Sequence, residues 1–148
     1  MKKFSVILLL LMVWPWHPSY AAKKDVIPGP VIAYVVSVYD GDTFTADAHV
    51  WPGHYINTGV RVLGVDTPEI KGKCPEEVAL AQRARAYVSN LLAKSEIVEL
   101  RNIQTDKYGG RVEADVYVDD KNLAELLIEA GLGRPYEGAK RQTWCEGS

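Results

Sequence analysis

The sequence predicts a mainly β domain of the α+β class, in which five short strands close into a barrel. The predicted elements follow the order β-β-β-α-β-β-α, and strand and helix do not alternate as they do in a doubly wound α/β fold. The composition suits one packed globular domain, because 47% of the 148 residues are hydrophobic and 24% are charged. Closing the short strands into a barrel would also remove exposed sheet edges.

The first two strands are predicted to form a hairpin. Residues 31–39 are a nearly continuous apolar, β-branched and aromatic stretch, which is typical of a strand buried on both faces. Asp40-Gly41 interrupts this stretch, and residues 43–47 then alternate Thr and Asp with Phe and Ala. Such alternation after a turn signal predicts a second strand that pairs back onto the first.

The third predicted strand spans residues 60–65, between a loop at 51–53 and a turn at Asp66. Residues 76–93 then form the clearest helical pattern in the chain. Its apolar stripe comprises Leu80, Ala84, Tyr87, Val88 and Leu91.

Residues 97–102 and 111–118 are the fourth and fifth predicted strands. A second helix is predicted after Asn122, which forms a capping-box pattern with Glu125, and it is expected to end at Gly131. Five strands, with one inserted helix and a second helix after strand 5, match an OB-fold Greek-key barrel.

The first 21 residues have the features of a secretory signal peptide. Two lysines precede an apolar run from Phe4 to Trp14, and small residues near Ala21 suit a signal peptidase. A membrane-crossing helix needs about 20 apolar residues, so an uncleaved membrane anchor is the less favoured alternative. We expect a signal peptide at 1–21, a flexible leader at 22–30 and the folded domain at 31–148, in a periplasmic or secreted protein.

Export favours pairing of the two cysteines, because disulfides persist in oxidising compartments. We expect a disulfide between Cys74 and Cys145, with two separate thiols as the alternative. Neither cysteine has a nearby His or second Cys at the spacing of a zinc site, so a thiolate metal centre is not expected.

The charge balance excludes a basic protein that coats nucleic acid. Asp and Glu outnumber Lys and Arg by 19 to 17. Any affinity for a polyanion must therefore come from positive charge gathered locally, because the whole surface offers little long-range attraction.

Three carboxylates lie where predicted strands end, namely Asp42, Asp66 and Glu69. The first is in the hairpin turn, and the other two flank Thr67-Pro68. Hard cations such as Ca²⁺ and Mg²⁺ bind carboxylate and carbonyl oxygens, and the proline favours an extended Thr67 whose carbonyl can face such an ion. Taken alone, these positions are explained at least as well by ordinary turn chemistry.

Two arginines favour a catalytic interpretation. Arg61 lies five residues before Asp66, and Arg111 opens the fifth predicted strand. Guanidinium groups can bind phosphate oxygens through two donors and stay charged at any working pH. A cation, these arginines and a water aligned or deprotonated near Glu69 could together hydrolyse a phosphodiester.

These residues lie in three segments, which are Asp40-Gly41-Asp42-Thr43, residues 61–69 (RVLGVDTPE) and residues 105–111 (TDKYGGR). In sequence and order, the segments resemble the signature regions of the staphylococcal nuclease family of thermonucleases. The resemblance covers roughly residues 31–132. Its most specific part is the five-residue step from Arg61 to Asp66.

The resemblance implies an OB-fold hydrolase that cuts DNA and RNA with little sequence preference and leaves 3′-phosphate ends. It implies that Asp42, Asp66 and the Thr67 carbonyl bind Ca²⁺. It also implies that Glu69 is the general base or organises the attacking water.

On the substrate side, the resemblance implies that Arg61 and Arg111 clamp the scissile phosphate. Lys107 and Tyr108 would contact the far phosphate or the base of the nucleotide. Gly110 is one residue more than the family's turn usually has before the arginine. We expect a monomer whose partners are its DNA and RNA substrates.

Two other functions stay open at this point. One is a catalytically inactive OB-fold module that binds single-stranded nucleic acid or an oligosaccharide, and the other is a surface domain whose acidic turns bind Ca²⁺ only structurally. Neither alternative function requires the acids and the arginines together, so the presence of both sets favours the nuclease. His49 and His54 are expected to be exposed loop residues rather than a metal-binding pair.

Overall fold

The computed structural model describes residues 25–145 of the chain. The expected signal peptide lies outside the described residues. Part of the expected leader forms a short strand, because β1 (Val26–Ile27) pairs antiparallel with β6 (Val98–Thr105). No helix within residues 25–145 is long and apolar enough to cross a membrane.

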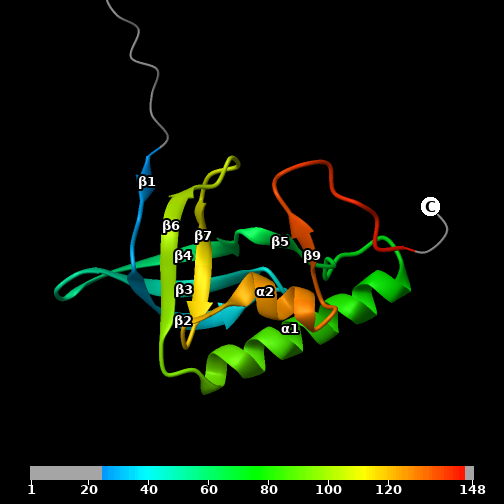
Figure 1. Cartoon of the computed structure of the whole chain (residues 1–148), viewed down its shortest axis with the longest axis horizontal. Helices are drawn as coiled ribbons and strands as arrows, with labels where there is room; N and C mark the ends of the chain where they lie inside the picture. The colour runs from blue at the N-terminus through cyan, green and yellow to red at the C-terminus, as the bar shows by residue number, and fades with distance from the viewer. Residues whose placement is uncertain (1–24, 146–148) are drawn as a thin grey trace, which may run out of the picture.

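Five strands close into a barrel (Figure 1). β2 (Val31–Val38) pairs with β3 (Thr43–Trp51), and β3 pairs with β4 (His54–Val62). β4 pairs in parallel with β7 (Arg111–Val118), β7 pairs with β6, and β6 returns to β2. The OB-fold Greek-key barrel predicted from the sequence is therefore confirmed.

Two helices accompany the barrel, as predicted. α1 (Pro75–Lys94) lies between β4 and β6 in the chain, and α2 (Leu123–Glu129) follows β7 after the two-residue β8 (Lys121–Asn122). The Asn122 side chain caps α2, because its oxygen accepts hydrogen bonds from the amides two and three residues on, at 2.8 and 3.3 Å. Gly131 ends this helix with a φ of 67°.

The core lies inside the barrel and beneath the two helices. Its largest fully buried apolar side chains are Phe44, Leu100, Leu123, Leu127, Val60, Val62, Val65, Val88 and Val116. On β3 and β7, buried residues alternate with more exposed ones over much of each strand, which is the pattern of a strand with one face on a core.

β2 is not buried on both faces, so this part of the prediction is wrong. Ala33 is 4% exposed, whereas Tyr34 and Val36 are 54% and 56% exposed. In a barrel, one face of each strand lines the interior and the other faces outward. A continuous apolar run therefore does not show that both faces are covered.

The third predicted strand is longer than expected and divided in two. β4 begins at His54, and β5 (Gly64–Asp66) follows it after a break. Gly64 adopts a φ of 83°, which redirects the chain, and β5 pairs with β9 (Arg134–Tyr136) outside the barrel. The break brings the end of β5 close to the β2–β3 turn.

Candidate active site

Asp42 links the β2–β3 turn to two other parts of the chain. Its carboxylate is buried, and Oδ1 accepts hydrogen bonds from the Arg61 guanidinium at 3.0 Å and from the Thr43 hydroxyl at 2.9 Å. Oδ2 accepts a hydrogen bond from the Thr67 amide at 3.2 Å. Because a buried charge needs such partners, Asp42 holds these segments together.

Asp40 is a second buried carboxylate in the same turn. Its Oδ1 accepts a hydrogen bond from the Asp42 amide at 3.2 Å. Burial and, next, the negative charge of Asp42 raise the pKa of Asp40 to about 7. Our sequence reasoning did not assign Asp40 to the site. The available signal was a second acid directly beside Gly41, within the first family segment.

Asp66, Thr67 and Glu69 follow β5. Asp66 and Thr67 are buried, whereas the Glu69 side chain is 41% exposed. The Glu69 amide donates to Glu77 Oε1 at 3.3 Å, and the Lys73 amide donates to Oε2 of the same carboxylate at 2.8 Å. The first turn of α1 therefore holds the loop that carries Glu69.

Arg111 is held at the start of β7 by an ion pair with the buried carboxylate of Asp106. Burial acts to raise the pKa of Asp106, but hydrogen bonds from the Tyr108 amide and from Arg111 outweigh it and lower the pKa. Gly109 and Gly110 have φ values of 72° and 75°, so the extra glycine lies within the turn.

One cleft of about 860 Å³ connects these segments. The predicted catalytic residues Arg61, Glu69 and Arg111 all line it, as do Lys107 and Tyr108. The structure thus places the predicted catalytic and substrate-binding side chains along a single cavity. Asp40 and other acidic side chains line the same cleft as these positive side chains.

Arg141 also lines this cleft, and our sequence reasoning missed it. Its guanidinium pairs with the carboxylates of Asp66 and Glu69, and Nη2 donates to the Thr67 carbonyl at 3.1 Å. Burial acts to lower the pKa of Arg141, but these carboxylates outweigh it and raise the pKa above its ordinary value. The signal that could have revealed Arg141 is its position four residues before Cys145.

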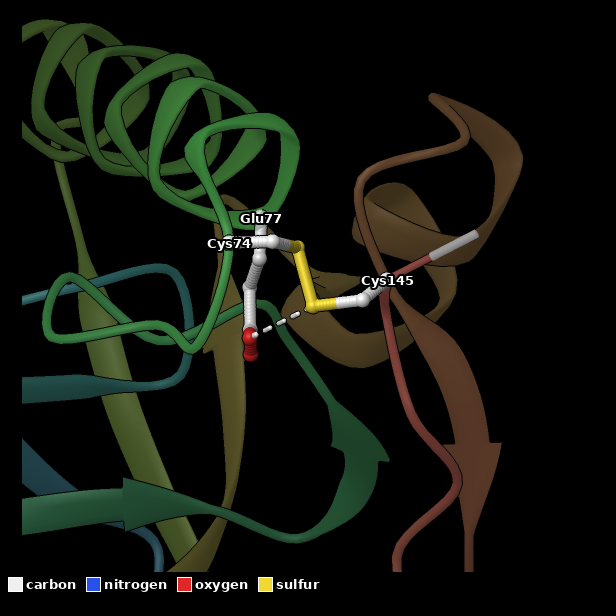
Figure 2. A group of neighbouring side chains, drawn as sticks. All are labelled: Cys74, Glu77 and Cys145. Atoms are coloured by element: carbon white, nitrogen blue, oxygen red, sulfur yellow. Dashed lines mark hydrogen bonds between the residues drawn. A yellow bond between two sulfur atoms is a disulfide. The ribbon is translucent and has the colours of Figure 1, made fainter. Parts of the chain in front are cut away.

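The predicted disulfide is present between Cys74 and Cys145. Cys74 is the residue before α1, so the bond attaches the C-terminal segment to the start of this helix. Figure 2 shows Glu77 beside the bond, with Cys145 Sγ 3.8 Å from Glu77 Oε2. The same carboxylate therefore lies between the disulfide and the Glu69 loop.

His49 and His54 do not line the cleft. They belong to β3 and β4 rather than to a loop. His54 is exposed, whereas His49 is half-buried. The His49 ring stacks on Tyr55 with the ring centroids 4.8 Å apart. The expectation of two loop histidines is therefore wrong in location, because the hairpin strands extend further than predicted.

Residues 59–146 match the staphylococcal nuclease homologue (SNase) family. The match covers more than half of the chain. This chain belongs to the SNase family. The matched range includes Arg61, Asp66, Glu69 and Arg111, whereas Asp42 precedes it. No curated protein matches the chain.

In this SNase-family chain, Asp42, Asp66 and the Thr67 carbonyl offer the types of oxygen that a hard cation binds. Carboxylates and a backbone carbonyl are the ligands that Ca²⁺ and Mg²⁺ prefer. A positive group, the Arg141 guanidinium, already contacts Asp66 and the Thr67 carbonyl and so acts as a stand-in for a cation. In addition, the buried Thr67 Oγ1 has no hydrogen-bond partner among residues 25–145, which leaves it available to a water.

Proposed function

We propose that this protein is an exported, Ca²⁺-dependent endonuclease. It would hydrolyse phosphodiester bonds of DNA and RNA with little sequence specificity and leave 3′-phosphate ends. The observation that carries the proposal is that Arg61, Glu69 and Arg111 line one cleft, beside the buried carboxylate of Asp42. Membership of the SNase family supports the nuclease class, and the signal-like pattern at residues 1–21 supports export.

The cation site would consist of Asp42, Asp66 and the Thr67 carbonyl. When bound, Ca²⁺ supplies electrostatic stabilisation of the negative charge that develops on the phosphate oxygens. Asp42 would serve two purposes, because its Oδ1 also accepts a hydrogen bond from Arg61. The same carboxylate would therefore place Arg61 next to the cation site.

Two arginines would bind the scissile phosphate. Arg61 and Arg111 are retained near the cleft by Asp42 and Asp106, and each guanidinium has five N–H donors. The donors not used by these carboxylates can bind phosphate oxygens. Arginines already held in place lose less conformational freedom when the transition state forms, so more of their interaction energy lowers the barrier.

Glu69 would activate the attacking water. Its carboxylate reaches solvent, while its backbone is held by Glu77. A fixed and accessible carboxylate can align a water molecule and accept its proton. This role requires Glu69 to be released from its contact with Arg141.

Lys107 and Tyr108 would bind the nucleotide beside the reacting phosphate. The Lys107 ammonium lies 4.9 Å from the Tyr108 ring centroid, and Tyr108 is 78% exposed. An exposed ring can stack on a base without regard to its identity, and an ammonium can pair with a phosphate. This pairing supports low sequence specificity.

The proposal is tested with purified mature protein, supercoiled plasmid and RNA, in Ca²⁺ or in chelator. We expect cleavage of both nucleic acids only with Ca²⁺, and products that a polymerase extends only after a 3′-phosphatase has acted. Binding without cleavage in Ca²⁺ would indicate the inactive OB-fold module instead. Cleavage in chelator would contradict the cation dependence.

A further inference from the structure

The segment after β9, residues 137–145, lines part of the cleft and is called the strap below. In Figure 1 it is the orange-to-red loop that leaves β9 and returns to the start of α1. Arg134 in β9 holds the C-terminal end of the strap. Its Nη1 donates to the Thr143 carbonyl at 2.8 Å, and its Cζ lies 3.7 Å from the Trp144 ring centroid. The disulfide from Cys145 to Cys74 closes the strap.

The strap supplies hydrogen-bond donors to the oxygens at the end of β5. Arg141 contacts Asp66 Oδ1, the Thr67 carbonyl and the Glu69 carboxylate. The Trp144 indole N–H donates to Asp66 Oδ2 at 3.2 Å. Both oxygens of this buried carboxylate therefore accept hydrogen bonds from the strap.

The contacts with Asp66 differ from an ordinary surface ion pair. An exposed pair is held weakly, because water competes with it and both side chains are mobile. Here the Asp66 side chain is only 5% exposed, and the strap around Arg141 is fixed by Trp144 and the disulfide. A tethered group returns to its site quickly, since the tether raises its effective concentration there.

The contacts also use the oxygens that the proposed function assigns to Ca²⁺. Ca²⁺ approaches its oxygen ligands to about 2.3–2.6 Å, whereas a guanidinium N–H needs its donor about 2.9 Å away. A cation at these oxygens would lie beside the Arg141 guanidinium, and the two positive charges would repel each other. A cation at these oxygens therefore competes with Arg141.

On the assumption that the proposed function is right and these oxygens bind Ca²⁺, we propose that Arg141 is an internal competitor for the cation. It occupies the Asp66–Thr67 oxygens in the cation-free protein and leaves them when Ca²⁺ binds, and the Cys74–Cys145 tether strengthens this competition. The apparent affinity for Ca²⁺ is then reduced by the fraction of molecules in which Arg141 occupies the site.

The test is calorimetric titration of Ca²⁺ into the metal-free, full mature chain at fixed pH and ionic strength. We expect Arg141→Gln to lower the Kd for Ca²⁺ by about tenfold or more, as follows if Arg141 occupies the site in about nine molecules of ten. Lys140→Gln is the matched control, because it removes the same charge one residue earlier. It should change the Kd by less than about twofold.

The tether is tested by combining the variants. Cys74→Ser with Cys145→Ser should lower the Kd when residue 141 is Arg and leave it unchanged when residue 141 is Gln, because the tether acts through Arg141. The NMR signal of the Arg141 Nε–H should also move when Ca²⁺ is added to the wild-type chain.

The outcomes separate the two proposals. Equal Kd values for wild type and Arg141→Gln, or an equal effect of Lys140→Gln, would overturn the competition while leaving the nuclease proposal intact. If neither wild type nor Arg141→Gln binds Ca²⁺, the cation site itself is wrong, and the competition falls with it.

Discussion

Burial separates the carboxylates that anchor other groups from the one that can react. Asp42 and Asp106 are 1% and 3% exposed, and each binds an arginine of the cleft. Glu69 reaches solvent, although Arg141 contacts it. A group that exchanges protons with water must be accessible, so Glu69 rather than Asp42 suits the role of base.

Glu69→Gln is expected to lower kcat by about 100-fold or more, because an amide of the same size cannot accept a proton from water. Plasmid cleavage at saturating Ca²⁺ measures the effect, with unfolding temperature as the check on the fold. Glu76→Gln, an exposed acid on α1, is the control and should leave kcat unchanged. Near-normal turnover of Glu69→Gln would remove this residue from the mechanism.

Because the pKa of Asp40 is raised in the folded chain, we expect the free energy of unfolding to depend on pH in the presence of chelator. Burial and the charges of Asp42 and Glu69 raise its pKa from 3.8 to about 7 in the folded chain. Between these values the folded state binds more protons than the unfolded state, so this group makes stability fall as the pH rises from about 4 to about 7.

Asp40→Asn should remove this component, because an amide has no charge to lose and can still accept the hydrogen bond from the Asp42 amide. Urea unfolding at several pH values measures it. The variant should gain free energy of unfolding relative to wild type as the pH rises. A difference that does not change with pH would show that Asp40 titrates alike in both states.

At the scale of elements, short segments outside the barrel position the loop that carries Glu69. β5 leaves the barrel at Gly64, and its pairing with β9 brings the strap to the loop that follows β5. α1 contributes Glu77, whose two carboxylate oxygens accept hydrogen bonds from the amides of Glu69 and Lys73 in this loop. The loop with Glu69 is therefore positioned by the helix that follows it and by β9, which is distant in the sequence.

Glu77→Ala is expected to lower the free energy of unfolding by about 2 kcal/mol, because the amides of Glu69 and Lys73 lose their buried acceptor. Glu76→Ala removes the same charge from the first turn of α1 but is exposed, and should cost at most about 0.5 kcal/mol. Urea unfolding of both variants measures the difference. Equal losses would show that the charge near the helix N-terminus, rather than the loop contacts, is what matters.

For the whole molecule, the barrel and the disulfide act on different parts of the chain. The barrel closes through β4–β7 and β2–β6, which join strands on both sides of α1. The disulfide joins residues separated by 71 positions and attaches the strap to the helix. Each of these contacts closes a loop, and loop closure reduces the conformational entropy of the unfolded chain only when the link is covalent.

Replacing both cysteines by serine is expected to lower the free energy of unfolding by about 4 kcal/mol on the loop-entropy model. Denaturant unfolding in chelator measures this loss without a contribution from bound cation. A loss below about 1 kcal/mol would show that the unfolded chain is already restricted, or that the bond costs energy in the folded state.

Local patterns were sufficient for most of the fold. The alternation at residues 111–118 and the Asn122 cap depend on neighbours in the chain, and both match the structure. The exposed side chains of Tyr34 and Val36 were not predicted, because an apolar run does not reveal which face the barrel leaves outside.

For the candidate site too, part could be predicted from the sequence and part could not. The sequence by itself determined the candidate acids and arginines, since the three family segments are short and contiguous, and it left one possible pairing within the chain, Cys74 with Cys145. Only the tertiary structure decided that Arg141 contacts Asp66, 75 positions earlier, and that Asp40 is buried with a raised pKa. Both depend on which distant segments pack together and exclude water, and a linear pattern carries no such information.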